Sequence, residues 1–383
     1  MPLQLFERRI LKGELTLVEA SGAHHRFGTG TPRATWVMRK PDTLSRILKN
    51  PAMELGETYL DEGWDVTDGT LADLLTILRN NLNDLAQQRT LLTRFAALLN
   101  SWNDLKASIA NVHHHYDLDE DLFRAFLDRD MHYSCAYFRD SDMSLESAQM
   151  AKCNHIARKL LLAPGQRVLD IGCGWGSLAL HLAESADVSV TGLTLSAEQL
   201  RVARDAAARR GLIPRVEFHA QDYRKHYGQY DRIVSVGMFE HVGRRNFRRY
   251  FEQLARQLRP KGVALLHTIG STRPPKSTNA WVRRHIFPGG YLPSLSTLCA
   301  AIEQARLMIG DIEILRPHYA LTLKEWNRRF QAQRERFAAS KGERFCRMWE
   351  FYLVTSQTAF EYGDLVVYQV QLGGRDAPFP ATR

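Results

Sequence analysis

The chain has 383 residues, enough for one large hydrophobic core or two modest ones, and we expect a small domain before a larger one. Hydrophobic residues make up 44% and charged residues 24%, as in ordinary soluble globular proteins. No stretch approaches the apolar length of a membrane span, and residues 1–9 lack the apolar core of a signal peptide. The sequence therefore predicts a cytoplasmic protein.

The formal net charge of +9 predicts an anionic partner, either nucleic acid or a phospholipid surface. Arginine pairs lie beside aromatic and apolar residues at Arg244-Arg245, Arg248-Arg249, Arg283-Arg284 and Arg328-Arg329. An apolar face rimmed by arginines suits phospholipid headgroups above acyl chains. The alternative for each pair is a solvated helix surface.

The cysteines and histidines do not indicate a disulfide framework or a metal site. The five cysteines are widely spread and form no Cys-x-x-Cys pair, so we expect reduced thiols. The run His113–His115 has no second cluster with ligand spacing, so we expect no metal.

Residues 1–100 predict a small α+β domain, with strands at Glu14–Val18 and Ala34–Met38 and helices at Thr43–Lys49 and Leu71–Leu99. Its periodic apolar residues from Leu71 to Leu78 favour a core face over a lipid-binding face. It holds no catalytic cluster, so we expect it to serve docking, dimerisation or lipid contact. Residues 101–115 are polar and predict a linker, followed by a catalytic domain at 116–383.

From Arg167 onward, strand and helix patterns alternate. Strands are predicted at 167–172, 188–195, 215–219, 230–236 and 263–268, and helices from Ser177, at 196–210 and at 245–258. Such alternation predicts an α/β fold with a mainly parallel sheet covered by helices on both faces. Ligands of these sheets bind beyond the carboxyl ends of the strands. We therefore expect these strand-end residues to converge on one pocket: Gly172, Thr194, Asp222, Glu240 and His267.

The run from Arg167 to Gly176 is typical of a buried strand that breaks into a glycine loop before a helix. Its three alternate glycines let the backbone approach a ligand closely. The next strand ends at Gly192 and Thr194, where dinucleotide dehydrogenases carry an acidic residue for the ribose, so the loop favours S-adenosylmethionine over a nicotinamide.

Two polar residues near this loop have alternative roles. Gln199 either contacts the cofactor or completes a capping box with Ser196. Asp222 either reaches the adenine edge or caps its own turn. After the fourth core strand the chain has Met238-Phe-Glu-His-Val-Gly243 in place of the Asn/Asp-Pro-Pro-aromatic motif of amino-directed methyltransferases, which weakens nucleic-acid methylation as a function.

Five motifs then occur in one order: Tyr133-Ser-Cys-Ala-Tyr-Phe138, Gly172-Cys-Gly-Trp-Gly176, Met238-Phe-Glu-His-Val-Gly243, His267-Thr-Ile-Gly270 and Ile286-Phe-Pro-Gly-Gly290 with Leu292-Pro-Ser294. Together they resemble the cyclopropane-fatty-acyl-phospholipid synthase family, including its mycolic-acid relatives. The likeness runs from about His114 to Leu372, and residues 55–64 extend it into the amino-terminal domain.

The resemblance implies a class I methyltransferase fold, Rossmann-like, and a set of site residues. S-adenosylmethionine would be held by Tyr133, Ser134, Asp170, Gly172, Gly174, Gly176, Thr194, Gln199, Asp222 and Tyr223. A bicarbonate ion would lie among Cys135, Glu240, His267, Ile269 and Tyr319, with Cys135 and Ile269 contacting it through the main chain. It also implies a homodimer at the inner face of the membrane.

The expected reaction adds a methylene unit to the cis double bond of an unsaturated phospholipid acyl chain. Methyl transfer to an alkene leaves a carbocation, so the pocket must exclude water and hold a base that removes one proton. From position alone, Glu240 could instead be a salt-bridge partner, His267 a structural histidine and Tyr319 a packed aromatic. The alternative products are methylene- or methyl-branched chains. More distant alternatives are a non-catalytic lipid-binding protein and a nucleic-acid methyltransferase.

One position departs from the family pattern. Family members commonly carry a cysteine after a late Tyr-Leu pair, and this chain has Ser356 there. Serine is a much weaker nucleophile than a thiolate. Either that cysteine is dispensable for the chemistry, or the product differs.

Overall fold

The computed structural model describes residues 2–82, 120–274 and 279–380. These residues form two compact units. The first takes the described parts of 1–97, 277–287 and 323–364, and the second those of 98–276, 288–322 and 365–383. The predicted linker 101–115, which contains the histidine run, lies outside the described residues. Two segments of the predicted catalytic domain at 116–383, residues 277–287 and 323–364, therefore belong to the first unit.

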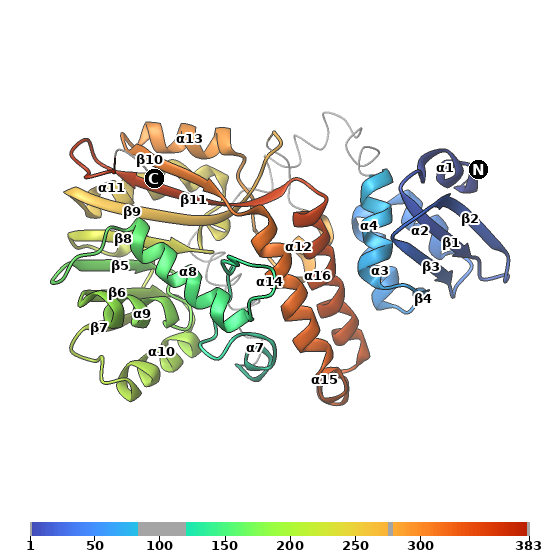
Figure 1. The fold of residues 1–383 in the computed structure, drawn as a ribbon, viewed down its shortest axis with the longest axis horizontal. Helices are drawn as coiled ribbons and strands as arrows, with labels where there is room; N and C mark the ends of the chain where they lie inside the picture. The colour runs from blue at the N-terminus through green and yellow to red at the C-terminus, as the bar shows by residue number, and fades with distance from the viewer. Residues whose placement is uncertain (1, 83–119, 275–278, 381–383) are drawn as a thin grey trace. The chain divides into compact units, whose positions relative to one another are not determined.

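The first unit contains a four-stranded sheet in the order β2-β1-β3-β4 (Figure 1). Its strands are β1 (Gly13–Val18), β2 (His24–Thr29), β3 (Arg33–Met38) and β4 (Trp64–Asp68), and β1 and β3 are parallel. Its helices are α1 (Pro2–Arg9), α2 (Thr43–Lys49), α3 (Pro51–Leu60) and α4 (Leu71–Leu82). The two strands and the 43–49 helix predicted here are confirmed.

Helices from late in the sequence complete this first unit: α12 (Ala280–His285), α15 (Arg334–Lys341) and α16 (Glu343–Glu361). Arg79 of α4 donates to the carbonyl oxygen of Thr355 at 3.0 Å. The Arg347 guanidinium lies 3.9 Å from the centre of the Tyr59 ring and donates to the Tyr59 carbonyl. A Cβ at Gly56 would lie 2.4 Å from the indole nitrogen of Trp281, so only glycine fits there. The apolar face of α4 is buried, as the core interpretation predicted.

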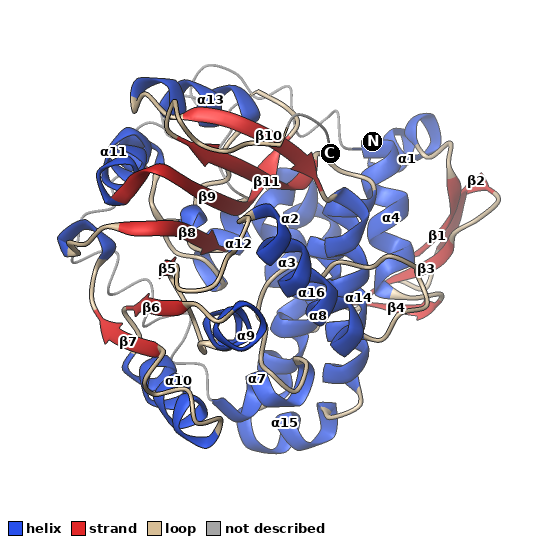
Figure 2. Cartoon of the chain, turned by 60° about the vertical axis from the view of Figure 1, so that its left-hand side comes forward, coloured by secondary structure: helices blue, strands red, loops and turns tan. Residues whose placement is uncertain are grey.

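The second unit is built on a seven-stranded sheet in the order β10-β11-β9-β8-β5-β6-β7 (Figure 2). The strands are β5 (Arg167–Ile171), β6 (Ser189–Thr194), β7 (Val216–Ala220), β8 (Tyr230–Val236), β9 (Leu258–Ser271), β10 (Met308–Ile314) and β11 (Leu365–Gly373). The five strands from β9 to β7 are parallel, β11 is antiparallel to β9, and β10 is antiparallel to β11. The predicted mainly parallel sheet is confirmed.

Helices cover both faces of this sheet (Figure 1). On one face, α8 (Leu145–Lys159), α9 (Ser177–Ala186) and α10 (Ala197–Arg209) pack in one apolar cluster. On the other face, α11 (Phe247–Gln257) and α13 (Leu295–Gln304) pack in a second. Val168, Leu169 and Ile171 of β5 are all buried because both faces are covered, which explains the uninterrupted apolar run.

The remaining elements of the second unit are short, or continue beyond it. They are α7 (Glu120–Phe126) and the 3₁₀ turns η2 (Tyr223–Lys225), η3 (Phe239–His241) and η4 (Arg244–Asn246). Helix α14 (Arg316–Gln331) starts in this unit and continues into the first. Among the described residues, no helix is long and apolar enough to cross a membrane.

Candidate functional site

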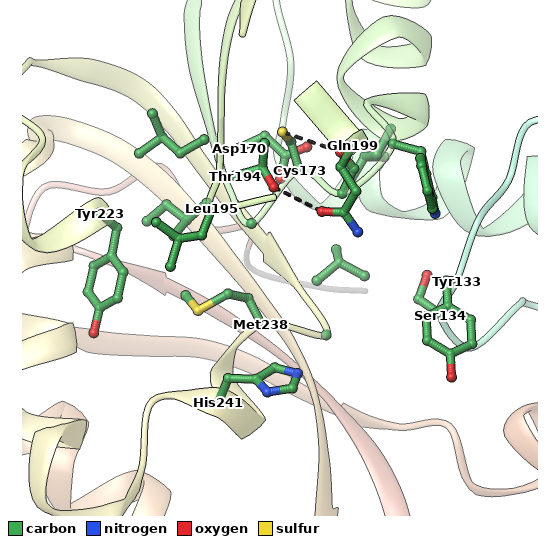
Figure 3. A pocket seen from close by; sticks show the side chains of 18 of the residues that line it. Tyr133, Ser134, Asp170, Cys173, Thr194, Leu195, Gln199, Tyr223, Met238 and His241 are labelled. Atoms are coloured by element: carbon green, nitrogen blue, oxygen red, sulfur yellow. Dashed lines mark hydrogen bonds between the residues drawn. The ribbon is translucent and has the colours of Figure 1, made fainter. Parts of the chain in front are cut away.

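A cavity opens beyond the carboxyl ends of β5, β6 and β8, where the alternating pattern predicted it. Its walls include most residues predicted to bind the cofactor: Tyr133, Ser134, Asp170, Gly172, Gly174, Thr194, Gln199, Asp222 and Tyr223. Figure 3 shows Tyr133 and Ser134 on one side of this cavity and Tyr223 on the opposite side, with Met238 between them. Of the strand-end residues expected to converge, Glu240 and His267 do not line the cavity, although the neighbouring Met238 and His241 do.

The glycine loop after β5 shapes the cavity floor. Gly174 has a φ of +53°, and a Cβ built on it would meet no heavy atom within 4 Å. It therefore faces open space that a ligand can fill. Gly176 has a different role, because its Cβ would lie 2.8 Å from the side chains of Ala203 and Phe218. The structure places Gly176 in close helix packing and outside the cavity lining.

Two buried groups of opposite charge face the same cavity. Asp170, only 1% exposed, has a carboxylate oxygen, Oδ2, with no hydrogen-bond partner among the described residues. Burial raises the pKa of Asp170 to about 7, and the Lys152 ammonium partly opposes this. Lys152, also 1% exposed, donates from Nζ to Ser134 Oγ at 3.0 Å. This pair fits a zwitterionic amino-acid group such as that of S-adenosylmethionine, because each charge finds its opposite there.

Gln199 and Asp222 both make the capping contacts that the sequence allows as alternatives to cofactor contact. The Gln199 N–H donates to Ser196 Oγ at 3.3 Å, and Gln199 Oε1 accepts from Thr194 Oγ1 at 2.9 Å (Figure 3). Asp222 accepts from the Arg224 backbone N–H at 2.8 Å and from its guanidinium at 2.6 Å. Both residues also line the cavity, so capping holds them in place there.

Helix α8 fastens the loop that carries Tyr133 and Ser134. Gln149 Nε2 donates to the Ser134 carbonyl at 3.0 Å and to the His132 carbonyl at 3.3 Å. The Tyr133 ring packs edge-on to Phe123 of α7 at 5.1 Å. Sequence reasoning missed Gln149 and Lys152. Their spacing of three residues puts them on one face of a helix, and two polar residues on a buried face were the available signal.

Glu240 and Ile269, two of the residues expected around bicarbonate, are in direct contact. Glu240 Oε1 accepts from the Ile269 backbone N–H at 2.7 Å. The other oxygen, Oε2, is buried without a hydrogen-bond partner among the described residues. Burial raises the pKa of Glu240 to about 7, so the protonated form of the carboxyl group is populated near neutral pH.

His267 is held by a residue that the sequence analysis did not single out. Gln369 of β11 lies directly opposite His267 of β9 in the sheet register, and its Nε2 donates to His267 Nδ1 at 3.1 Å. Burial, with Lys152 and other nearby charges, lowers the pKa of His267 to about 3. The imidazole is therefore neutral, with its proton on Nε2.

Cys135 and Tyr319 lie on two segments that hydrogen bonds connect, the loop at residues 135–138 and the first turns of α14. The backbone N–H of Ala136 donates to Thr322 Oγ1 at 3.0 Å, and that of Phe138 donates to His318 Nδ1 at 3.1 Å. Tyr319 lies between these two residues on α14 and is buried. Burial raises the pKa of the Cys135 thiol far above its usual value, so it is no nucleophile at neutral pH. None of the five predicted bicarbonate residues lines the cavity described above.

The arginine pairs at residues 244–249 do not rim an exposed apolar face. Their aromatic neighbours Phe247, Tyr250 and Phe251 are buried in the core beneath α11. The arginines themselves are exposed, and Arg248 pairs with Glu252 at 2.7 Å. At this place the structure shows the solvated helix surface that was the alternative.

Comparison with known proteins matches residues 103–370 to the family described as mycolic acid cyclopropane synthetase. The chain is 42% identical over 344 residues to the cyclopropane-fatty-acyl-phospholipid synthase of Escherichia coli (strain K12), covering 89% of this chain and 88% of that one. It is 37% identical over 390 residues to tuberculostearic acid methyltransferase UfaA1 of Mycobacterium tuberculosis, covering 96% and 89%.

A solved structure, mycolic acid cyclopropane synthase CmaA1 complexed with SAH and CTAB, superposes with a TM-score of 0.66 at 34% identity. It covers 69% of this chain and 97% of that one. The neighbours include further methyltransferases of lower identity, which agree on the class I methyltransferase fold.

Proposed function

The chain belongs to the mycolic acid cyclopropane synthetase family and is an S-adenosylmethionine-dependent methyltransferase; from this premise we propose that it is a cyclopropane-fatty-acyl-phospholipid synthase. It would transfer a methylene unit to the cis double bond of unsaturated phospholipid acyl chains. The observation that carries the proposal is Glu240: a buried carboxyl group with one unpaired oxygen, two residues from a wall residue of the cofactor cavity.

The residues that line the cofactor cavity would bind and orient S-adenosylmethionine. S-adenosylmethionine, when bound, supplies an electrophilic methyl group. Asp170 and Lys152 offer opposite charges for its amino-acid part, while Gly174, where a Cβ would meet no atom within 4 Å, lets the backbone approach it. Such positioning matters because an isolated alkene is a poor nucleophile, and alignment of the two reacting carbons can contribute several orders of magnitude in rate.

The second end of the site would handle the acyl carbocation. Glu240 and His267 are both buried, so water that would trap the cation is kept away from them. Bound bicarbonate would supply the base that accepts the proton lost when the ring closes. Protonated Glu240 and His267 Nε2–H are donors that suit an anion, and a neutral Glu240 avoids the cost of two adjacent negative charges.

Ile269 and Cys135 would take part through their backbones. In this structure the Ile269 N–H is already bonded to Glu240. Ile269 therefore orients the carboxyl group, and its N–H becomes a ligand for an anion only if Glu240 releases it. Tyr319 would add a phenol from α14.

We place the enzyme at the inner face of the membrane because its substrate is a phospholipid and its net charge is +9. The first unit would serve lipid contact or dimerisation. A methylene- or methyl-branched product is the second candidate, since the relative at 37% identity is named a tuberculostearic acid methyltransferase rather than a cyclopropane synthase.

The decisive experiment incubates the purified protein with labelled S-adenosylmethionine and vesicles of a mono-unsaturated phospholipid. Cyclopropane and methylene-branched products have equal mass, so the released acyl chain is identified by NMR. We expect a cyclopropane ring, slower turnover in bicarbonate-free buffer, and recovery when bicarbonate is added back. An unmodified acyl chain would overturn the proposal, and a turnover indifferent to bicarbonate would remove the ion from it.

Variants test the roles of the two buried side chains. Glu240→Ala and His267→Ala should keep S-adenosylhomocysteine binding, measured by calorimetry, and lose turnover. Both lie outside the lining of the cofactor cavity, so loss of cofactor binding in either variant would contradict the division of the site into two ends.

A further inference from the structure

Three buried side chains, one of them in the lining of the cofactor cavity, form a connected row that the proposed reaction does not use. His132 Nδ1 lies 2.8 Å from Asp128 Oδ2, and His132 Nε2 lies 3.2 Å from Cys153 Sγ. Asp128 also accepts from the His132 backbone N–H at 2.8 Å, and the imidazole has a partner at each ring nitrogen, Asp128 at Nδ1 and Cys153 at Nε2. A thiol beside an imidazole that a carboxylate orients is the arrangement of an activated nucleophile.

Within this row, each charged group shifts the pKa of its neighbour toward the charged form. Burial alone would raise the pKa of the Cys153 thiol, but His132 and Lys152 outweigh it and lower that pKa below its usual value. Burial and Lys152 act to lower the pKa of His132, yet Cys153 and Asp128 raise it overall. Burial acts to raise the pKa of Asp128, but the hydrogen bonds and charge of His132 outweigh burial. The pKa of Asp128 is therefore lowered. All three directions favour a thiolate, an imidazolium and a carboxylate.

The other four cysteines lack such a partner and have the opposite tendency. Burial raises the pKa of the thiols of Cys135, Cys173, Cys299 and Cys346. Cys173 makes the sharpest contrast, since it lines the cofactor cavity itself, whereas Cys153 lies behind the wall. If access alone governed reactivity, Cys173 would react before Cys153.

The row is attached to the cofactor cavity at two points. His132 is among the residues that line the cavity, and so is Lys152, the residue before Cys153 on α8. The same turn of α8 holds the neighbouring loop through the bonds from Gln149 and Lys152 to Ser134. Cys153 is therefore one contact away from two residues of the cavity lining, and a change at Cys153 reaches the residues that would hold the cofactor.

We propose that Cys153, activated by His132 and Asp128, is an oxidation site for hydrogen peroxide, and that its oxidation weakens cofactor binding. The Cys153 thiolate sulfur attacks one peroxide oxygen, an S–O bond forms, and the O–O bond breaks. The second oxygen leaves with the proton of the His132 imidazolium as water. Sulfur loses two electrons to the peroxide, and the product is a sulfenic acid.

The product does not fit the space that the thiolate occupied. Sγ and Nε2 are 3.2 Å apart, a hydrogen-bond distance that leaves no room for an inserted oxygen atom. His132 must move, and its carbonyl and the Ser134 carbonyl are both bonded to Gln149. The wall of the cavity that carries Tyr133 and Ser134 is thus displaced.

The test treats the full-length protein with hydrogen peroxide, traps sulfenic acids with dimedone, and follows all five cysteine peptides by mass spectrometry. We expect Cys153 to be labelled about tenfold or more faster than Cys173, because reactivity follows the thiolate fraction. S-adenosylhomocysteine, which binds in this cavity if the proposed function holds, should slow the labelling of Cys153. Faster labelling of Cys173 than Cys153, or no protection by S-adenosylhomocysteine, would overturn the proposal.

Variants separate activation from access. His132→Gln and Asp128→Asn should each slow labelling of Cys153 about tenfold while the chain unfolds at the usual denaturant concentration. Cys153→Ala should bind S-adenosylhomocysteine equally well before and after peroxide, whereas the wild type loses affinity on treatment. Equal labelling in His132→Gln and the wild type, or peroxide-sensitive binding in Cys153→Ala, would contradict the assigned activation or the assigned consequence.

Discussion

Replacing Glu240 with glutamine should stabilise the protein in a strongly pH-dependent way. Glu240 is buried, and burial raises its pKa from 4.5 to about 7. One pKa unit corresponds to about 1.4 kcal/mol, so ionised Glu240 costs the folded state about 3 kcal/mol. Because the folded pKa lies above the unfolded one, this stability is complete below pH 4.5 and is lost as the pH rises toward 7.

Glutamine resembles the neutral carboxyl group at every pH and can still accept from the Ile269 N–H. The free energy of unfolding of Glu240→Gln should therefore exceed that of the wild type by about 2.5 kcal/mol more at pH 8 than at pH 5. Guanidinium unfolding at the two pH values measures this difference. Glu303→Gln, on the exposed surface of α13, is the matched control and should show no such change. An identical difference at both pH values would refute the assigned protonation of Glu240.

Three further variants test the site. Gly174→Ala should weaken S-adenosylhomocysteine binding about tenfold or more. Gly165 is the matched control, because it also has a positive φ and open space around a built Cβ but lies outside the cavity lining. Gly165→Ala should cost the same backbone strain of about 1 kcal/mol and leave the affinity unchanged. Equal calorimetric affinities would contradict the cavity assignment. Gln369→Leu leaves His267 Nδ1 without its donor, so turnover should fall about tenfold at unchanged S-adenosylhomocysteine affinity; a loss of affinity instead would indicate a structural role. Lys152→Met should lower S-adenosylhomocysteine affinity about tenfold or more, because it removes the buried positive charge of the cavity; unchanged calorimetric affinity would exclude Lys152 from binding.

Much of the second unit follows from local patterns. Strands β5 and β8 are largely buried on both faces and contain apolar runs, and the sequence predicts the four strands from β5 to β8 to within a few residues. The edge strand β10 was missed because its residues are only partly buried and show no clear period. Strand β9 was predicted too short, since Arg259, Pro260 and Lys261, which follow its first residue, are charged or exposed.

The division into units could not be predicted from the sequence either. Helix α16 lies more than 250 residues after α4, yet it belongs to the same unit through contacts such as that of Arg79 with Thr355. Gly176 was assigned to cofactor binding with its neighbours Gly172 and Gly174. Only packing shows that it instead makes room for Ala203 and Phe218.

The sequence by itself determined the α/β alternation, the glycine turn at Gly172–Gly174 and the ordered motifs that identify the family, because these depend on residues close together in the chain. The tertiary structure decided the protonation of Asp170, Glu240 and His267, since a pKa depends on how completely distant segments exclude water from a group. It also joined Cys153 to His132 across 21 positions of sequence. No local pattern specifies that contact, because it exists only where α8 packs against the loop before Tyr133.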